Sequence, residues 1–115
     1  MKKVISVHEY QLKNNISDAQ FESAVENARS RKLFSLPGLI DYYFLRRIRG
    51  TREVSYTAIW IYKNRDSWEK IWGEKNNPLP KNQYPEKWKI WEDEILAPLI
   101  TQESDRIQYA AYEEF

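Results

Sequence analysis

The strongest constraint on the fold is a pair of strand-like segments that carry apolar residues on both faces. Residues 39–49 and 54–63 alternate as β-strands do, and Gly50 and Thr51 between them are typical of a hairpin turn. An antiparallel hairpin commonly keeps one face in water, which makes one of its alternating sets polar. Because both sets are largely apolar here, the two segments predict a sheet that is covered on both sides.

The other elements follow from helix caps, turn residues and apolar spacing. The predicted elements are, in chain order, a strand over 3–13, a helix from the Ser17–Gln20 capping box to Leu33 or Phe34, the two hairpin strands, a short helix capped by Asp66 and stopped by Gly73, a longer helix from Pro85 to Pro98, and a strand over 107–115. The predicted inner stripe of the longer helix is Trp88, Trp91, Ile95 and Leu99, and its predicted solvent face is Glu92, Asp93 and Glu94.

The order of elements, β-α-β-β-α-α-β, is that of an α+β, ferredoxin-like split βαβ with an extra helix and an antiparallel four-stranded sheet. With 115 residues the chain fits one domain, residues 1–115. Helices cover one face of such a sheet, and the other face is equally apolar. A second copy of the same chain would cover it, so we expect a homodimer joined through the sheet faces.

Composition argues against several classes of function. The chain has 18 Lys and Arg against 17 Asp and Glu, which does not favour a nucleic-acid partner, and the arginines between residues 46 and 52 are interpreted as a solvated hairpin end. With no cysteine and one histidine, no metal site is expected. No apolar segment is long enough for a signal peptide or a membrane span, so we expect a cytoplasmic protein without a membrane partner.

Three stretches carry a resemblance to a known superfamily. They are VHEYQLK in the first strand, LPGLIDYYFLR entering the second, and YTAIWIYKNRDSWEKIW, a strand, turn and helix. In these stretches the chain resembles the dimeric α/β-barrel superfamily, which includes antibiotic-biosynthesis-type monooxygenases, haem-degrading monooxygenases, and NIPSNAP and EthD-like proteins. The resemblance implies that two ferredoxin-like subunits pack sheet against sheet, and that each subunit holds a ligand pocket between its sheet and its helices.

The haem-degrading members use an Asn on the first strand, a Trp on the helix after the third strand, and a His that binds the iron. By that resemblance His8 falls about where the Asn would lie, and Trp72 falls close to the Trp. No histidine follows Trp72 in the sequence, so the iron ligand is missing. We therefore do not expect haem degradation, and no cofactor is predicted.

His8 is the candidate catalytic residue. A histidine base suits removal of a proton from a phenol or an enol, because its unperturbed pKa of about 6.5 lies near neutral pH. The alternative is that a single histidine on a half-apolar strand is structural. The aromatic side chains likewise either line a pocket or fill the core. The predicted ligand-binding residues are Tyr10, Tyr43, Trp60, Tyr62, Trp68, Trp72 and Trp91.

Two functions remain open from the sequence. In the first, the chain binds a small molecule and acts as a cofactor-independent monooxygenase or isomerase on an aromatic or polyketide-like substrate. In the second, it is a non-catalytic binding or structural homodimer whose aromatic residues form the core. A cavity of about 300 Å³ or more that touches both His8 and a tryptophan would favour the first function.

Overall fold

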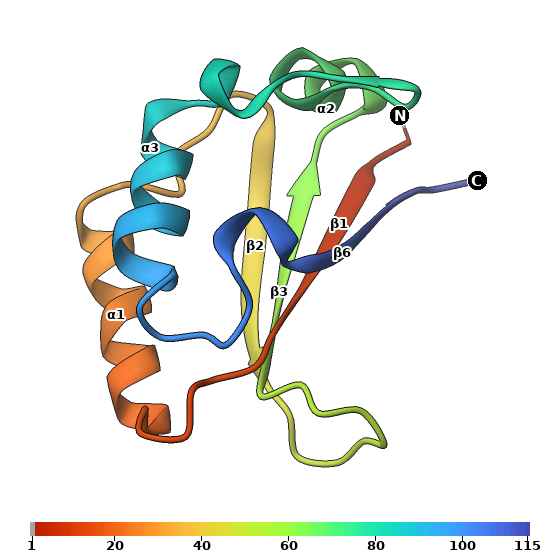
Figure 1. Ribbon diagram of the computed structural model, residues 1–115. Helices are drawn as coiled ribbons and strands as arrows, with labels where there is room; N and C mark the ends of the chain where they lie inside the picture. Colours follow the sequence, from red (N-terminus) through yellow and green to blue (C-terminus); the bar gives the residue numbers. More distant parts are fainter. Residues whose placement is uncertain (1) are drawn as a thin grey trace.

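A computed structural model describes residues 2–115 and is built around a four-stranded sheet (Figure 1). The strands are β1 (Val4–Tyr10), β2 (Leu39–Arg46), β3 (Tyr56–Tyr62) and β6 (Gln108–Glu113), in the order β2-β3-β1-β6. All neighbouring strands run antiparallel. With the helices between them the strands form the split βαβ arrangement, so the predicted ferredoxin-like α+β fold is confirmed.

α1 (Asp18–Ser30) packs along one face of the sheet (Figure 1). It begins at the predicted capping box, in which Ser17 Oγ accepts from the Gln20 amide at 3.1 Å and the Gln20 side chain accepts from the Ser17 amide at 2.7 Å. Its buried side chains follow the predicted apolar stripe: Phe21, Val25 and Ala28. The capping box and the stripe together fix where the helix starts and which side it buries.

α2 (Arg65–Trp72) follows β3 and lies beyond the end of that strand (Figure 1). Asn64 caps it, because Asn64 Oδ1 accepts from the Ser67 amide at 2.8 Å. The prediction that Asp66 caps this helix is wrong. Asn64 has the extended backbone of a cap residue, while Asp66 already lies in the first turn. Gly73 ends the helix as predicted, with a left-handed φ of 92° that favours glycine.

α3 (Glu86–Lys89) continues directly into η2 (Ile90–Leu96), which is a π-helix. The Ala97 amide donates to the Glu92 carbonyl at 3.0 Å, five residues back along the chain. This wider turn brings residues four apart nearly into line, and four buried side chains follow that spacing: Trp88, Glu92, Leu96 and Ile100. The prediction that Glu92 faces solvent is therefore wrong, because its side chain is only 7% exposed.

Short elements connect these parts. The segment after α2 forms a small hairpin in which Gly73 is required, since an added Cβ would lie 2.5 Å from the Leu79 nitrogen. The short elements are β4 (Gly73–Glu74), β5 (Asn77–Pro78), η1 (Lys81–Gln83) and η3 (Ser104–Arg106).

The core lies between the inner face of the sheet and the helices, and it is largely aromatic. Phe21 stacks on Tyr56 with ring centroids 4.3 Å apart, and Trp60 meets Trp88 edge-on at 4.9 Å. The outer face of the sheet is not covered by any part of residues 2–115 (Figure 1). Its apolar side chains are Ile5, Val7, Tyr43, Leu45, Ile59, Ile61 and Tyr112.

Candidate functional site

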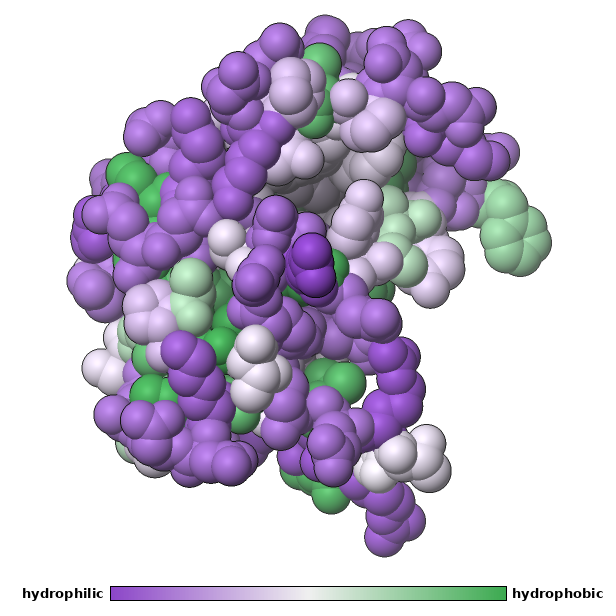
Figure 2. Space-filling view, in the orientation of Figure 1, coloured by the Kyte–Doolittle hydropathy of each residue, from purple (hydrophilic) through white to green (hydrophobic). Residues whose placement is uncertain are grey.

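A cavity of about 260 Å³ opens between the inner face of the sheet and the segments α2, η1, η2 and η3. Figure 2 shows it as a hollow in the upper half of the molecule, with pale side chains inside and hydrophilic ones around the opening. The aromatic residues that line it are Tyr62, Trp68, Trp72, Tyr84, Trp88 and Tyr109. The charged residues near the opening are Glu74, Lys75, Lys81 and Asp105. A flat apolar ligand would therefore find ring faces inside and polar groups at the mouth.

Tyr62 and Trp72 form one wall of the cavity. The Trp72 indole N–H donates to the Tyr62 hydroxyl at 3.1 Å. Burial raises the pKa of Tyr62, against the opposite effect of the Trp72 hydrogen bond, so this hydroxyl stays protonated at neutral pH. Because the bond from Trp72 uses a lone pair of the hydroxyl oxygen, the Tyr62 O–H can itself donate to a ligand oxygen.

His8 lies on the inner face of β1, opposite Tyr109 of β6, and borders the cavity. Its Nε2 is 3.2 Å from Ser6 Oγ, and its buried Nδ1 has no hydrogen-bond partner among residues 2–115. The rings of Trp88 and Tyr109 both lie 5.7 Å from the imidazole. Burial lowers the pKa of His8 to about 4, so the imidazole is neutral at pH 7 and is a weak base.

Glu92 reaches the same cavity from η2. Burial raises the pKa of its carboxyl group to about 7, against the opposing effects of the Lys81 charge and the Trp88 indole. A carboxylate with a pKa near the working pH can both accept and return a proton. Of the groups that line the cavity, Glu92 thus has the acid–base properties that the sequence assigned to His8.

A hydrogen-bonded cluster holds the mouth of the cavity together. The Lys81 ammonium donates to Asp93 Oδ1 at 2.8 Å and to Ser104 Oγ at 3.3 Å. The Ser104 hydroxyl also donates to Asp93 Oδ1, at 2.8 Å. These three residues come from η1, η2 and η3, so the cluster joins segments that are far apart in the chain.

The structure distributes the predicted site residues over three places. Those that line the cavity are His8, Tyr62, Trp68 and Trp72. Those that lie fully buried in the core and do not line it are Tyr10, Trp60 and Trp91. Tyr43 lies on the outer face of the sheet, half exposed, because it pairs with Ile59 and not with the inward-facing set of β3. The predicted ligand-binding set therefore does not come together as one group.

Sequence reasoning missed Glu92, and its signal was the spacing of four residues between Trp88 and Glu92. In a helix, positions three and four residues after Trp88 lie on the same side, so Trp91 and Glu92 are both candidates for the inner face. Glu92 was assigned to solvent because it is charged and is followed by Asp93 and Glu94. In the structure both Trp91 and Glu92 are buried.

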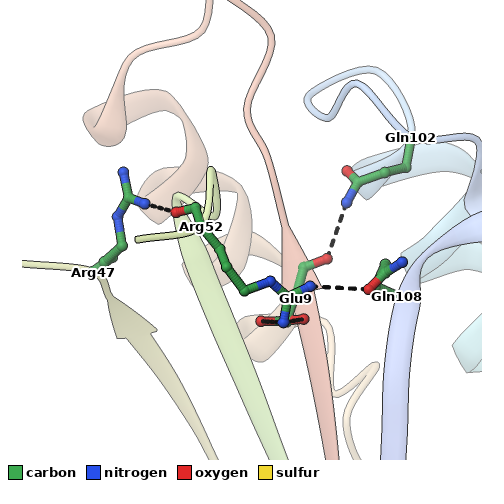
Figure 3. Close-up of polar contacts among 5 residues, drawn as sticks. All are labelled: Glu9, Arg47, Arg52, Gln102 and Gln108. Carbon is green, nitrogen blue, oxygen red and sulfur yellow. Dashed lines mark hydrogen bonds and ion pairs between the residues drawn. The ribbon is translucent and has the colours of Figure 1, made fainter. Parts of the chain in front are cut away.

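Two arginines of the hairpin form ion pairs with acidic residues of neighbouring elements. Arg52 forms an ion pair with Glu9 of β1 at 3.0 Å and donates to Gln108 Oε1 of β6 at 3.0 Å (Figure 3). Arg46 forms an ion pair with Glu22 of α1 at 2.8 Å. These contacts agree with the interpretation of the cluster as a solvated hairpin end.

Within residues 2–115, no helix is long and apolar enough to cross a membrane. In that same part of the chain, no three or more His, Cys, Asp and Glu side chains are grouped so that they could hold a metal ion.

The sequence matches no known protein-family profile and no curated protein sequence. Solved structures do resemble it. A dimeric ferredoxin-like protein of unknown function from Jannaschia sp. matches with a TM-score of 0.64 and 10% identity, over 97% of this chain and 99% of its own. SnoaB, a cofactor-independent oxygenase from Streptomyces nogalater, matches with a TM-score of 0.56 and 15% identity, over 97% of this chain and 92% of its own. An EthD-family protein from Bacillus halodurans matches with a TM-score of 0.61 and 14% identity, over 100% of both chains.

The chain shares the ferredoxin-like α+β fold of these solved structures. The resemblance stated from the sequence is thus confirmed at the level of fold. Similar structures from Thermobifida fusca and Bacteroides fragilis are also described as dimeric ferredoxin-like proteins of unknown function. The comparisons therefore show the fold of this chain.

Proposed function

We propose that the cavity binds a small aromatic or polyketide-like molecule and that the reaction begins with removal of a proton, as in a cofactor-independent monooxygenase or isomerase. The observation that carries the proposal is that His8 and Glu92 line one mainly apolar cavity of about 260 Å³. This volume is somewhat smaller than that of typical ligand pockets, roughly 300 Å³ and above. A ligand with one or two rings suits it.

The residues around the cavity supply what such a ligand needs. Tryptophan and tyrosine rings offer flat apolar contact, and the Tyr62 hydroxyl can donate to a ligand oxygen. His8, in its neutral form, can donate through one ring nitrogen and accept through the other. We assign His8 a direct contact with the ligand.

Two reactions follow from proton removal at a carbon beside a carbonyl. In isomerisation the proton returns to a different carbon, and no other reactant is needed. In monooxygenation the carbanion reacts with molecular oxygen, so that a CH₂ group becomes a carbonyl while the second oxygen atom leaves as water with the two hydrogens. The fold that the chain shares with SnoaB supports the second reaction.

The test of ligand binding uses 2-naphthol, an uncharged two-ring phenol, as the probe. We expect it to quench tryptophan fluorescence and to raise the melting temperature of the wild-type protein by mass action. His8→Ala is expected to weaken binding, while Ser23→Ala, on the exposed side of α1, is expected to leave it unchanged. Absence of binding to the wild type would favour the alternative, a structural homodimer with an aromatic core.

We further propose that two copies of the chain pair through the outer face of the sheet. Tyr43, Leu45 and Tyr112 on this face are 50%, 48% and 61% exposed in the single chain. A contiguous apolar surface of this kind is unusual on a monomer and typical of an interface. A self-complementary contact across a two-fold axis is the commonest solution. The dimeric state of similar structures supports this proposal.

A further inference from the structure

Glu92 is buried at a cost that the fold does not need. Glu92 is 7% exposed, and the ammonium of Lys81, whose charge lowers the pKa of Glu92, is hydrogen-bonded to Asp93 at 2.8 Å, which leaves the Trp88 indole as the hydrogen-bond partner that favours the carboxylate. A buried carboxylate loses several kcal/mol of hydration unless it is paired, so a structural role would be served better by an apolar residue. The π-helical turn that brings Glu92 inward is itself a rare feature that often occurs at functional sites.

The charge balance of the cavity distinguishes Glu92 from His8 as a base. If His8 took a proton from an uncharged substrate, the cavity would gain a buried imidazolium and a buried anion at once. If the Glu92 carboxylate takes it, the negative charge passes from Glu92 to the substrate, and the number of buried charges does not increase. Burial disfavours creation of charge, so Glu92 is the better acceptor.

The cavity wall formed by Tyr62 and Trp72 supplies a donor for the new anion. The Tyr62 hydroxyl accepts from the Trp72 indole at 3.1 Å, and its own O–H can donate toward the cavity. Donation from Trp72 polarises the Tyr62 O–H and strengthens this second hydrogen bond. A hydroxyl held in this way is suited to stabilise a developing enolate oxygen.

We propose that Glu92 is the catalytic base of this cavity and that its substrate is an uncharged aromatic ketone with an acidic C–H beside the carbonyl. The inference rests on the proposed function of the same cavity. The C–H bond breaks, its electron pair forms the C=C bond of an enolate, and the proton forms an O–H bond on Glu92. The enolate oxygen accepts from Tyr62, and Glu92 later returns the proton. A substrate that carries its own carboxylate is excluded because it would add a like charge beside Glu92.

The experiment follows proton removal from 2-tetralone, a two-ring ketone, by hydrogen–deuterium exchange at its C1 position in D₂O, measured by NMR. Binding is measured separately by tryptophan fluorescence quenching. We expect the wild type to accelerate exchange, and Glu92→Gln to slow it by at least about 100-fold while binding is retained. Glu92→Asp keeps a carboxylate and is expected to retain part of the activity. Glu94→Gln, an exposed neighbour on the same helix, is the matched control and should exchange like the wild type.

The outcomes separate this inference from the proposed function. If 2-tetralone binds and exchange persists in a folded Glu92→Gln but is lost in His8→Asn, Glu92 is not the base and the proposed function stands. If 2-tetralone binds to the wild type without accelerated exchange, the catalytic role of Glu92 is overturned while the binding cavity stands. If neither 2-tetralone nor 2-naphthol binds, both proposals fail. Circular dichroism of each variant establishes that it is folded.

Discussion

The indole N–H of Trp72 donates to the hydroxyl of Tyr62 across 3.1 Å and thereby fixes the last turn of α2 to the end of β3. Two elements that are consecutive in the chain are joined at the wall of the cavity. Because Tyr62 is almost fully buried and Trp72 half-buried, little water competes for this hydrogen bond.

Trp72→Phe is expected to lower the free energy of unfolding by about 1–2 kcal/mol, from the lost hydrogen bond and the smaller buried ring. Denaturant unfolding of the two proteins measures the difference. Trp68→Phe removes another indole from the same cavity wall while the Tyr62–Trp72 bond is kept, and should cost less. Equal losses in both variants would mean that ring area, and not the hydrogen bond, holds α2 in place.

His8 makes the free energy of unfolding of this protein depend on pH. Burial lowers its folded pKa from 6.5 to about 4, so the unfolded chain takes up the proton first as the pH falls. This stabilising contribution is complete above pH 6.5 and is lost as the pH falls through 4, by up to about 3 kcal/mol. His8→Asn should lack this loss. Denaturant unfolding from pH 7 to pH 4 tests it, and parallel curves for variant and wild type would contradict the burial of His8.

Glu92 is expected to have the opposite effect and to lower the free energy of unfolding as the pH rises. Burial raises its folded pKa from 4.5 to about 7, so ionisation favours the unfolded chain as the pH rises. The wild type should therefore lose up to about 3 kcal/mol relative to Glu92→Gln between pH 4.5 and pH 7. Glu94→Gln serves as the exposed control and should follow the wild type. If Glu92→Gln gains no stability relative to the wild type across this range, the wild-type carboxylate is in contact with solvent or with a cation.

The fold was predictable because it depends on alternation and turns, which a sequence displays directly. The two-faced hairpin strands, the Ser17 capping box and the stop at Gly73 all recur in the structure. The site was less predictable, since alternation fixes the face of the sheet but not the depth of a side chain. Trp60 and Tyr62 share the inner face, yet Trp60 lies in the core and Tyr62 lines the cavity beside α2.

Backbone irregularities account for what the sequence did not reveal. The buried positions Trp88, Glu92, Leu96 and Ile100 follow a constant spacing of four through the π turn, whereas the stripe expected from the sequence steps through Trp91, Ile95 and Leu99. The cluster of Lys81, Asp93 and Ser104 depends on three separate segments meeting at the mouth of the cavity. Such a meeting is a property of the folded chain and not of any local pattern.

Ile59 lies at the middle of the outer face, paired with Val7 on one side and Tyr43 on the other, which makes it the most direct probe of the proposed dimer. Ile59→Asp would place a charge in an apolar contact, and we expect it to raise the dimer dissociation constant at least about 100-fold, or about 3 kcal/mol. Sedimentation velocity should then show a folded monomer at concentrations where the wild type is dimeric. Ser23→Asp adds the same charge on the opposite, helical side of the molecule and should leave the dimer intact. If the wild-type chain sediments as a monomer at micromolar concentration, the proposed sheet-to-sheet dimer is contradicted. The apolar outer face would then require a different partner.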